Sequence, residues 1–384
     1  MSNFINPQVL AAESLDQLDY ELVAGSLVYR DRTSDFSSVR GMKVGDFINI
    51  RTVTDFETNE FSAGGNITTQ EVNQSSTQLQ IEKHFDVSVE IGARERALNL
   101  DGIRKEIINP AMTSMAQKID TYLLTKMSQA QGLYASANLL SNAADIALAR
   151  SSANSQQVSK TNRIGLTNDA LEAQLLGTDA FNRFDSRSDA GVTALQEATI
   201  GRLMGIDWFS SINFDTSSRT LGDGAGVLDN TDAADNVQGL SVITTDATTG
   251  TFEAGDKIRI AGAKRAFTVS TQTTVGATEI PVVEQINENL SALDGAAITV
   301  IGDGVGTDVE YQGVIFNPGA FGFAAPPLDA AAGDKTGVAT ADGMSIRVTE
   351  AYDISTKKTF WSFDMLVGAA AVDARKAMLL GAAS

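Results

Sequence analysis

The stretch Asn99–Gly132, NLDGIRKEIINPAMTSMAQKIDTYLLTKMSQAQG, has the most regular pattern in the chain. Its apolar residues recur every three or four positions, which predicts a helix with two apolar stripes. The stripes consist of Ile103, Ile107, Ala111, Met115, Ile119 and Tyr122, and of Ile108, Met112, Ala116, Leu123 and Met127. The positions between them predict a solvated side: Lys105, Asn109, Thr113, Gln117 and Asp120. Gly132 is placed as a C-terminal cap. At ~1.5 Å per residue the helix is on the order of 50 Å long, too long for one compact lobe to cover.

Pro110 needs its own account, because an interior proline removes a backbone hydrogen bond and crowds the preceding turn. Two arrangements fit the sequence. Either one long helix kinks at Pro110, or Asn109 is an N-cap and Pro110 takes the first helical position. The helix of the second arrangement still measures roughly 35 Å.

Length and composition restrict the classes of protein. The 384 residues predict two or three structural units, and with 43% hydrophobic and 20% charged residues the chain can bury a sizeable core. Because the chain has no cysteine, disulfides and thiolate metal sites are excluded. The N-terminal residues lack an export-signal pattern, and no run of about 18 apolar residues predicts a membrane span. We therefore expect a soluble, intracellularly made protein.

The net charge of −19 argues against a nucleic-acid-binding surface, which is normally basic. It also means that many copies of the chain repel one another at long range. We expect any association between copies to depend on buried apolar area and short-range pairing, and to become tighter with salt.

Two β-rich segments precede the helix. Residues 76–91, STQLQIEKHFDVSVEI, alternate apolar and polar side chains over their whole length and form the clearest strand pattern. With VGDFINIRTV, residues 44–53, they predict a long two-stranded ribbon with its tip near Ser62–Thr69, very roughly 60 Å in reach. A free ribbon is marginal in water, and the chain offers no obvious surface for it. We therefore expect identical copies to shelter one another.

The N-terminal residues 1–36 carry scattered apolar side chains among acids, without a dense core pattern. They predict either a frayed terminus or an arm that becomes ordered on a neighbouring subunit. Apolar residues of the ribbon and the arm are the candidates for contacts between subunits: Phe61, Ile67, Leu79, Ile81, Phe85, Val9 and Leu10.

The remainder predicts a mixed α/β region, a small β unit and a closing hairpin. NRIGLT predicts a strand, NDALEAQLL a helix capped by Asn168, IGRLMGIDWFSSINF a glycine-turned strand, and SSANSQQVSK a loop. Residues 237–300 change to short Thr/Val-rich strands between two flexible GDGxG stretches, which predicts an inserted β-barrel or sandwich. GMSIRVTEAYDIST and KKTFWSFDMLVG predict a hairpin with Trp361, Phe363, Met365 and Val367 on one face.

Residues that could carry chemistry are few. The single histidine, His84, lies on the polar side of a regular strand, which predicts a solvated side chain. With no cysteine and one histidine, Cys/His nucleophile pairs and the common zinc sites are excluded. No GxxxxGK[ST] loop occurs, and GDGAG lacks the strand-then-helix context of a dinucleotide site. Asp223, Asp229, Asp232 and Asp235 do not fit a calcium loop. The sequence predicts a protein without enzymatic activity, cofactor or metal.

Three segments and their order resemble a known family. PAMTSMAQKIDTYLL (110–124) is similar to a spine helix, IGRLMGIDWFSS (200–211) to an axial-domain strand, and GMSIRVTEAYDISTKKTFWSFDMLVGAAAVDARKAMLL (343–380) to a C-terminal hairpin and final strand. The family is that of the major capsid proteins of tailed double-stranded DNA bacteriophages, with the Hong Kong 97 capsid fold. TTGTFEAGDKIRIAGAK (248–264) resembles the β-barrel inserted in coat proteins of some short-tailed phages.

The resemblance implies an α+β fold and a division of the chain into six parts. These are an N-terminal arm (1–36), an extended β-hairpin loop (37–92), a spine helix with the peripheral domain (93–132), an axial domain (133–236), an inserted β domain (237–305), and a return to the peripheral and axial domains (306–384).

The resemblance also implies a function and partners. The function is a shell around packaged double-stranded DNA, assembled in the host cytoplasm and present in the virion. The partners are copies of the chain in hexamers and pentamers, a portal protein and decoration proteins, with DNA held only non-specifically and no membrane. No lysine lies between Lys43 and Lys83, so covalent linkage through the loop is not expected. Because the arm starts at once, we expect a separate scaffolding protein.

Two other classes compete with this interpretation. An encapsulin-like compartment shell has the same fold but assembles alone around a protein cargo. A secreted carbohydrate-active or adhesive protein with a β module predicts a monomer with an export signal. The inserted β unit favours the phage shell over the first, and the missing export signal disfavours the second.

Overall fold

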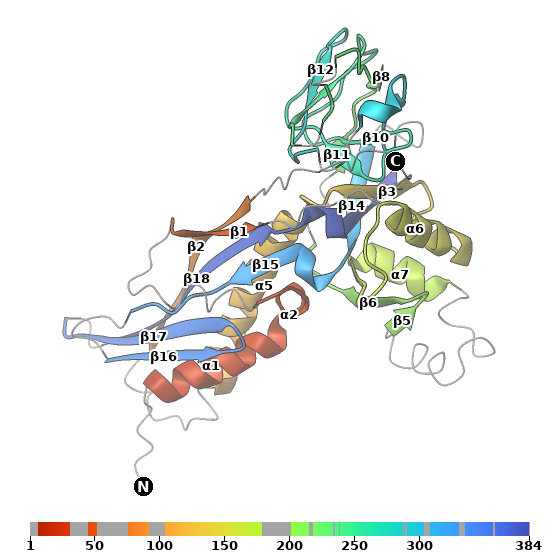
Figure 1. Ribbon diagram of the computed structural model, residues 1–384. Helices are drawn as coiled ribbons and strands as arrows, with labels where there is room; N and C mark the ends of the chain where they lie inside the picture. Colours follow the sequence, from red (N-terminus) through yellow and green to blue (C-terminus); the bar gives the residue numbers. More distant parts are fainter. Residues whose placement is uncertain are drawn as a thin grey trace, which may run out of the picture.

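The computed structural model describes residues 7–30, 45–51, 76–91, 104–178, 201–214, 218–232, 235–237, 239–286, 288, 290–302, 308–329, 335–355 and 358–383. Within these ranges the chain forms an elongated part built on one antiparallel sheet, a second part built on a mixed sheet with two helices, and a small β unit that projects from their junction (Figure 1). The mixture of helices and sheets agrees with the α+β class expected from the sequence.

The elongated part is a six-stranded antiparallel sheet with the order β1-β2-β18-β17-β16, and with β15 paired to β18. Its strands are β1 (Phe47–Arg51), β2 (Ser76–Ile91), β15 (Phe321–Ala324), β16 (Lys335–Ala341), β17 (Met344–Asp353) and β18 (Lys358–Ala371). The predicted hairpin of β17 and β18 is confirmed. The four side chains expected on one face of β18, Trp361, Phe363, Met365 and Val367, are all buried.

Helix α5 (Asn109–Met127) packs on one face of this sheet and follows a single π-helical turn, η2 (Arg104–Ile108). Pro110 is the second residue of α5, directly after the π-helical turn, so its missing N–H removes one bond from the continuing helix. Asn109 is not the cap, because Ile108 before it already has helical angles (φ −67°, ψ −50°). The helical backbone therefore continues across the proline by means of the wider π turn.

The predicted cap at Gly132 is wrong. Helix α5 ends at Met127, and Gly132 starts strand β3 (Gly132–Ser136). A Cβ atom at this position would lie 1.7 Å from Oε1 of Gln156, so a larger residue there would require this side chain to move. The apolar pattern beyond Met127 therefore belongs to a turn and a strand.

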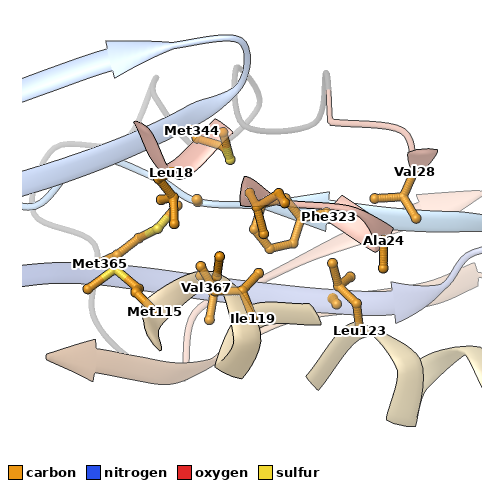
Figure 2. Packing of buried hydrophobic residues seen from close by; sticks show 14 of the residues in the cluster. Leu18, Ala24, Val28, Met115, Ile119, Leu123, Phe323, Met344, Met365 and Val367 are labelled. Carbon is orange, nitrogen blue, oxygen red and sulfur yellow. The ribbon is translucent and has the colours of Figure 1, made fainter. Parts of the chain in front are cut away.

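The largest hydrophobic core lies between α5, the N-terminal helices and the sheet (Figure 2). Figure 2 shows Met115 and Ile119 of α5 beside Met365 and Val367 of β18, with Leu123 further along the helix below Ala24. The five side chains of α5 and β18 are at most 1% exposed, which confirms both apolar stripes in this part of the helix. Asp120 departs from the prediction, since it was placed on the solvated side and has no exposed surface.

The described residues of the N-terminal segment, 7–30, are mostly helical. Helix α1 (Pro7–Glu21) lies on β16 and β17, and the short helix α2 (Ala24–Leu27) contacts α5. Leu10, Leu15 and Leu18 point into the core, with at most 3% exposure. Spacings of three to five residues place these side chains on one helix face, so the pattern that looked too sparse for a core is sufficient for a helix lying on a sheet.

Helix α1 also covers the open edge of the sheet. The side-chain amide of Gln8 donates to the carbonyl of Val338 (2.7 Å) and accepts from its N–H (3.2 Å), which satisfies an edge strand that would otherwise be free to pair. Gly337 next to it allows the approach, because a Cβ atom there would lie within 2.3–2.4 Å of the backbone of Pro7 and Gln8.

Replacing Gly337 with valine is expected to push α1 off the sheet. The backbone of Pro7 and Gln8 cannot yield as a flexible side chain could, so we expect a loss of about 2 kcal/mol or more in the free energy of unfolding. Ala341→Val, at an exposed position of the same strand, is the control and should change stability little. Urea unfolding measures both. Equal midpoints for the two variants would contradict this packing of α1.

The second part is a seven-stranded mixed sheet with the order β3-β19-β14-β4-β6-β5, and with β7 paired to β14. Its strands, besides β3, are β4 (Ile164–Thr167), β5 (Gly201–Leu203), β6 (Ile206–Ser210), β7 (Ser218–Thr220), β14 (Asp308–Phe316) and β19 (Ala377–Ala383). Helices α6 (Ala143–Ser155) and α7 (Asp169–Gly177) pack on it around a separate core. Asn168 caps α7 as predicted, accepting from the N–H of Leu171 (2.9 Å). Residues 151–155, predicted as loop, complete α6.

The small β unit contains β8 (Ala225–Val227), β9 (Val242–Thr244), β10 (Lys257–Ile260), β11 (Ala266–Thr268), β12 (Glu279–Pro281) and β13 (Ala297–Val300). These strands form a sheet of order β11-β10-β13-β8 and a pair β12-β9 around their own hydrophobic core. The short strands expected over residues 237–300 are confirmed as β9 to β13. The stretch 221–236, predicted as flexible, contributes β8, whose Ala225–Val227 pair with Thr299–Ala297 of β13.

Candidate subunit-contact surfaces

Strand β2, the longest candidate contact element, is fixed to helix α5 by one polar cluster. The carboxylate of Glu82 accepts from the hydroxyl of Tyr122 and from Nζ of Lys126, both at 3.0 Å. The Tyr122 oxygen in turn accepts from the N–H of Ala369 on β18 (3.3 Å). The Phe85 and Tyr122 rings meet edge-on, with their centroids 6.5 Å apart. These contacts hold β2, β18 and α5 in one fixed arrangement.

Burial and the neighbouring groups of this cluster shift the pKa values of Glu82 and Tyr122. Burial tends to raise the pKa of Glu82, but the hydrogen bonds from Lys126 and Tyr122 and the charge of Lys126 outweigh it, so the pKa lies below its usual value. Burial, with the hydrogen bond to Glu82 and its charge, raises the pKa of Tyr122. At neutral pH Glu82 is therefore a carboxylate, and the Tyr122 side chain that donates to it is a neutral phenol.

The expectation that the ribbon finds no support on its own chain is wrong for β2. Residues Ile81–Ile91 pair with Gly368–Thr359 of β18, so most of the strand lies inside the six-stranded sheet. Only Ser76–Gln80 pair with β1 as a ribbon. Alternation indicates a strand but not its partner, and this partner lies some 280 positions further along the chain.

The candidate contact residues fall into three groups. Leu10, Leu79 and Ile81 have no exposed surface and belong to the core of their own chain. Phe85 is half-buried against Tyr122, and Val9 is 45% exposed on the outer face of α1. Phe61 and Ile67 lie outside the described residues. Among the five candidates that the structure describes, Val9 and part of Phe85 present apolar surface that another copy can reach.

The structure adds an apolar surface that the sequence did not indicate. Tyr352, Ile354 and Phe360 are 52%, 73% and 37% exposed at the end of the β17–β18 hairpin. A second exposed pair, Phe209 (41%) and Ile212 (71%), lies at the end of β6. Each group sits at the distal end of a strand. Apolar residues at a strand end, where the alternation of apolar and polar positions stops, are the sequence pattern that could have indicated these surfaces.

The acids considered for calcium instead fix turns. Asp223 accepts from the N–H of Thr251 (2.9 Å), and Asp229 accepts from the N–H of Thr231 (2.9 Å). These hydrogen bonds, with those from the threonine hydroxyls, lower the pKa of both carboxyls. Within the described ranges, no group of three or more His, Asp or Glu side chains is arranged to hold a metal ion.

His84 lies on the outer face of the main sheet, as its strand position predicted. Its Nε2 is 3.7 Å from Oδ2 of Asp364, which is also paired with the guanidinium of Arg347. Asp364 is only 6% exposed, so the arginine compensates its charge whatever the state of the histidine. This arrangement is a cross-strand ion pair with a histidine at its rim.

Charged residues also lie at the root of the small β unit. Asp256, which has no exposed surface, accepts from the N–H groups of Gly222 (3.0 Å) and Glu253 (2.8 Å) and pairs with Arg219 of β7 (3.3 Å). Lys257 beside it is 2% exposed and donates to the Thr268 hydroxyl (2.7 Å). Burial lowers the pKa of Lys257 to about 8. The unit is thus fixed to the mixed sheet by directed contacts.

Among the helices of the described residues, none combines the length and the apolar character that crossing a membrane requires. No protein-family model matches the chain, and no curated protein matches its sequence.

Solved structures do match. A chain of the structure described as Mycobacterium phage Che8 has a TM-score of 0.51 at 13% identity, with 94% of this chain and 90% of that chain covered. The two chains share one fold. The capsid structure of the cyanophage P-SCSP1u has a TM-score of 0.47 at 13% identity, covering 94% and 87%. A chain of a virus-like particle from Pyrococcus furiosus has a TM-score of 0.44 at 9% identity, with 99% of this chain and 100% of that chain covered. At 13% identity the likeness to the Che8 chain is one of fold, and it extends over 94% of this chain.

Proposed function

We propose that this chain is the major capsid protein of a tailed double-stranded DNA phage. Its role is structural and not enzymatic: copies assemble as hexamers and pentamers into an icosahedral shell around packaged DNA. The observation that carries the proposal is the fold shared with the phage chain over 94% of the sequence. The order of the matching sequence segments, from the helix at 110–124 to the hairpin at 343–380, supports it independently.

The parts of the fold take roles in this proposal. Helix α5 with the six-stranded sheet is the peripheral domain, and the mixed sheet with α6 and α7 is the axial domain that surrounds the capsomer centres. β1 and β2 form the root of the extended loop, which reaches a neighbouring subunit beyond residue 51. Val9, Phe61, Ile67, Phe85 and the hairpin end around Ile354 are the proposed contacts between subunits. Leu10, Leu79 and Ile81 are not proposed again, since they fill their own core.

We assign the small β unit as an inserted domain. The strands before and after it lie side by side, with Thr220 of β7 paired to Asp308 of β14. Leu221 and Gly302 also approach closely, because a Cβ atom on the glycine would lie 2.9 Å from Leu221 Cδ1. The chain therefore leaves and re-enters the main body at one place, and the unit has its own core.

Replacing residues 221–307 with Asn-Gly is expected to leave a folded main body. The pairing of Thr220 with Asp308 fits a two-residue hairpin turn, for which Asn-Gly is well suited. Val309, fully buried and part of the small unit's core, becomes exposed, so Val309→Thr should accompany the change. We expect a loss of roughly 1–3 kcal/mol in the free energy of unfolding. An insoluble product, where deletion of another loop is tolerated, would contradict the assignment.

Expression together with a phage scaffolding protein tests the function. We expect closed particles some hundreds of ångströms across in negative stain, as for a shell of many copies. Expression without scaffold separates the phage shell from a compartment shell, which would close alone around protein cargo. A chain that stays monomeric in both experiments and in a phage lysate would contradict the proposal. Portal and decoration proteins are the further partners that purified virions would reveal.

A further inference from the structure

A pocket of about 500 Å³ lies where helix α6 faces the small β unit. Its floor is strand β3, with Leu133 and Ala135, and one wall is the outer face of α6. The opposite wall is formed by β10, β13 and the turn before β11. Gln131 fixes this geometry, because its side-chain amide, 2% exposed, donates to the carbonyl of Ala266 (2.5 Å).

The two walls of the pocket differ in chemistry. The β wall presents Arg259, Lys264 and Arg265, and the α6 wall presents Ser151, Ser152 and Ser155. Arg259 is exposed because it alternates with the buried Ile258 and Ile260 of β10. The Ser155 hydroxyl donates to the carbonyl of Ser152 (2.8 Å), so the pocket combines cations with the hydroxyl groups of Ser151 and Ser152, a set of donors suited to a carboxylate.

Two of these cations, Arg259 and Lys264, are not neutralised by the described part of the chain. In the part of the chain that the structure describes, no carboxylate lies within ion-pair distance of the side chains of Arg259 or Lys264. The carboxylate of Glu288 accepts a hydrogen bond from the backbone N–H of Lys264 (3.1 Å). The carboxylate of Asp145 accepts from the hydroxyl of Tyr134 and from the N–H of Leu140. A basic pocket is an exception in a chain with 48 acidic and 29 basic residues.

Apolar groups complete the site. Leu148 of α6, 58% exposed, and Ile301 after β13 line the same pocket. A ligand that uses both walls needs carboxylates together with apolar side chains, as a peptide segment has. A duplex nucleic acid would present only phosphates and is too broad to enter a pocket of about 500 Å³.

We propose that this pocket docks an acidic segment of a second copy of the chain. The inference rests on the proposed shell, which places identical copies side by side. Charge complementarity identifies the partner, because with a net charge of −19 most of a second copy's surface is acidic. The contact gives each copy one basic site that offsets the repulsion between like-charged neighbours.

Cross-linking tests the proposal directly, because the chain has no cysteine and a single introduced thiol is labelled selectively. Ser151→Cys, on the exposed α6 wall, carries a benzophenone maleimide into assembled particles. We expect photolysis to give a dimer of the chain, with the cross-linked peptide rich in Asp and Glu. Ala341→Cys on β16, a strand of the six-stranded sheet (Figure 1), is the control and should not give this peptide.

The charge of the pocket is tested separately. Arg259→Glu with Lys264→Glu is expected to lower the yield of particles about tenfold or more, while the soluble subunit keeps the wild-type melting temperature. Lys160→Glu, at an exposed position outside the pocket, should assemble normally.

Particles that form with no copy-to-copy product from Ser151→Cys, or with the label attached to nucleic acid or another protein, would overturn the docking proposal and leave the shell intact. A wild-type chain that never forms particles would instead overturn the proposed function.

Discussion

Replacing Asp120 with alanine is expected to lower the free energy of unfolding by about 3 kcal/mol. The carboxylate, without exposed surface, accepts from the N–H of Val23 at Oδ2 and from the N–H of Gly25 at Oδ1, both at 3.0 Å. Without it, two backbone donors at the turn from α1 to α2 are buried with no acceptor. Denaturant unfolding gives the magnitude.

The pH dependence of this site distinguishes a buried carboxylate from a solvated one. Burial raises the pKa of Asp120, and the hydrogen bonds from Val23 and Gly25 only partly oppose this. Because the folded chain binds the proton more tightly than the unfolded chain, the stabilisation is full below the unfolded pKa of about 3.9 and decreases as the pH rises through the higher folded pKa.

Asp120→Asn removes this titration while keeping one acceptor oxygen. The stability difference between wild type and Asp120→Asn should therefore be larger at pH 4 than at pH 7. A difference that grows toward pH 7 would show that the carboxyl has a lowered pKa, contrary to its burial.

Replacing Ile119 with aspartate is expected to cost roughly 4–5 kcal/mol and to prevent assembly. Ile119 has no exposed surface and lies between Met115, Leu123 and Val367 in the main core (Figure 2). An unpaired carboxylate cannot be solvated there. Thermal unfolding of the purified subunit and the yield of particles are the measurements.

Two controls separate core packing from helix propensity at this position. Ile119→Val removes one methylene group and should cost about 1 kcal/mol. Gln117→Asp introduces the same acid at an exposed position of the same helix and should change stability by under about 0.5 kcal/mol. Near-normal assembly of Ile119→Asp would remove this residue from the core that holds the peripheral domain together.

Local patterns predicted the elements well. The spacing of Met115 and Ile119, the alternation in residues 76–91 and the Asn168 cap each depend on neighbouring residues, and each is found in the structure. The short strands over residues 237–300 were predicted for the same reason, since turn residues bound each of them.

Long-range partners were the part that could not be predicted. That β2 pairs with β18, or that Asp120 is buried, depends on segments far away in sequence, because the donors to Asp120 are the N–H groups of Val23 and Gly25. Helix α1 was missed since its apolar face is complete only when it lies on β16. The pocket beside α6 joins residues more than 100 positions apart, so no local motif could indicate it.

The central claim, that copies of this chain form a closed shell, is tested most directly by electron cryo-microscopy of particles from co-expression with scaffold. The account predicts hexamers and pentamers in which each subunit keeps the six-stranded sheet described here and extends residues 52–75 over a neighbouring subunit. A homogeneous monomer, or particles in which residues 52–75 return to their own sheet without touching another copy, would contradict it.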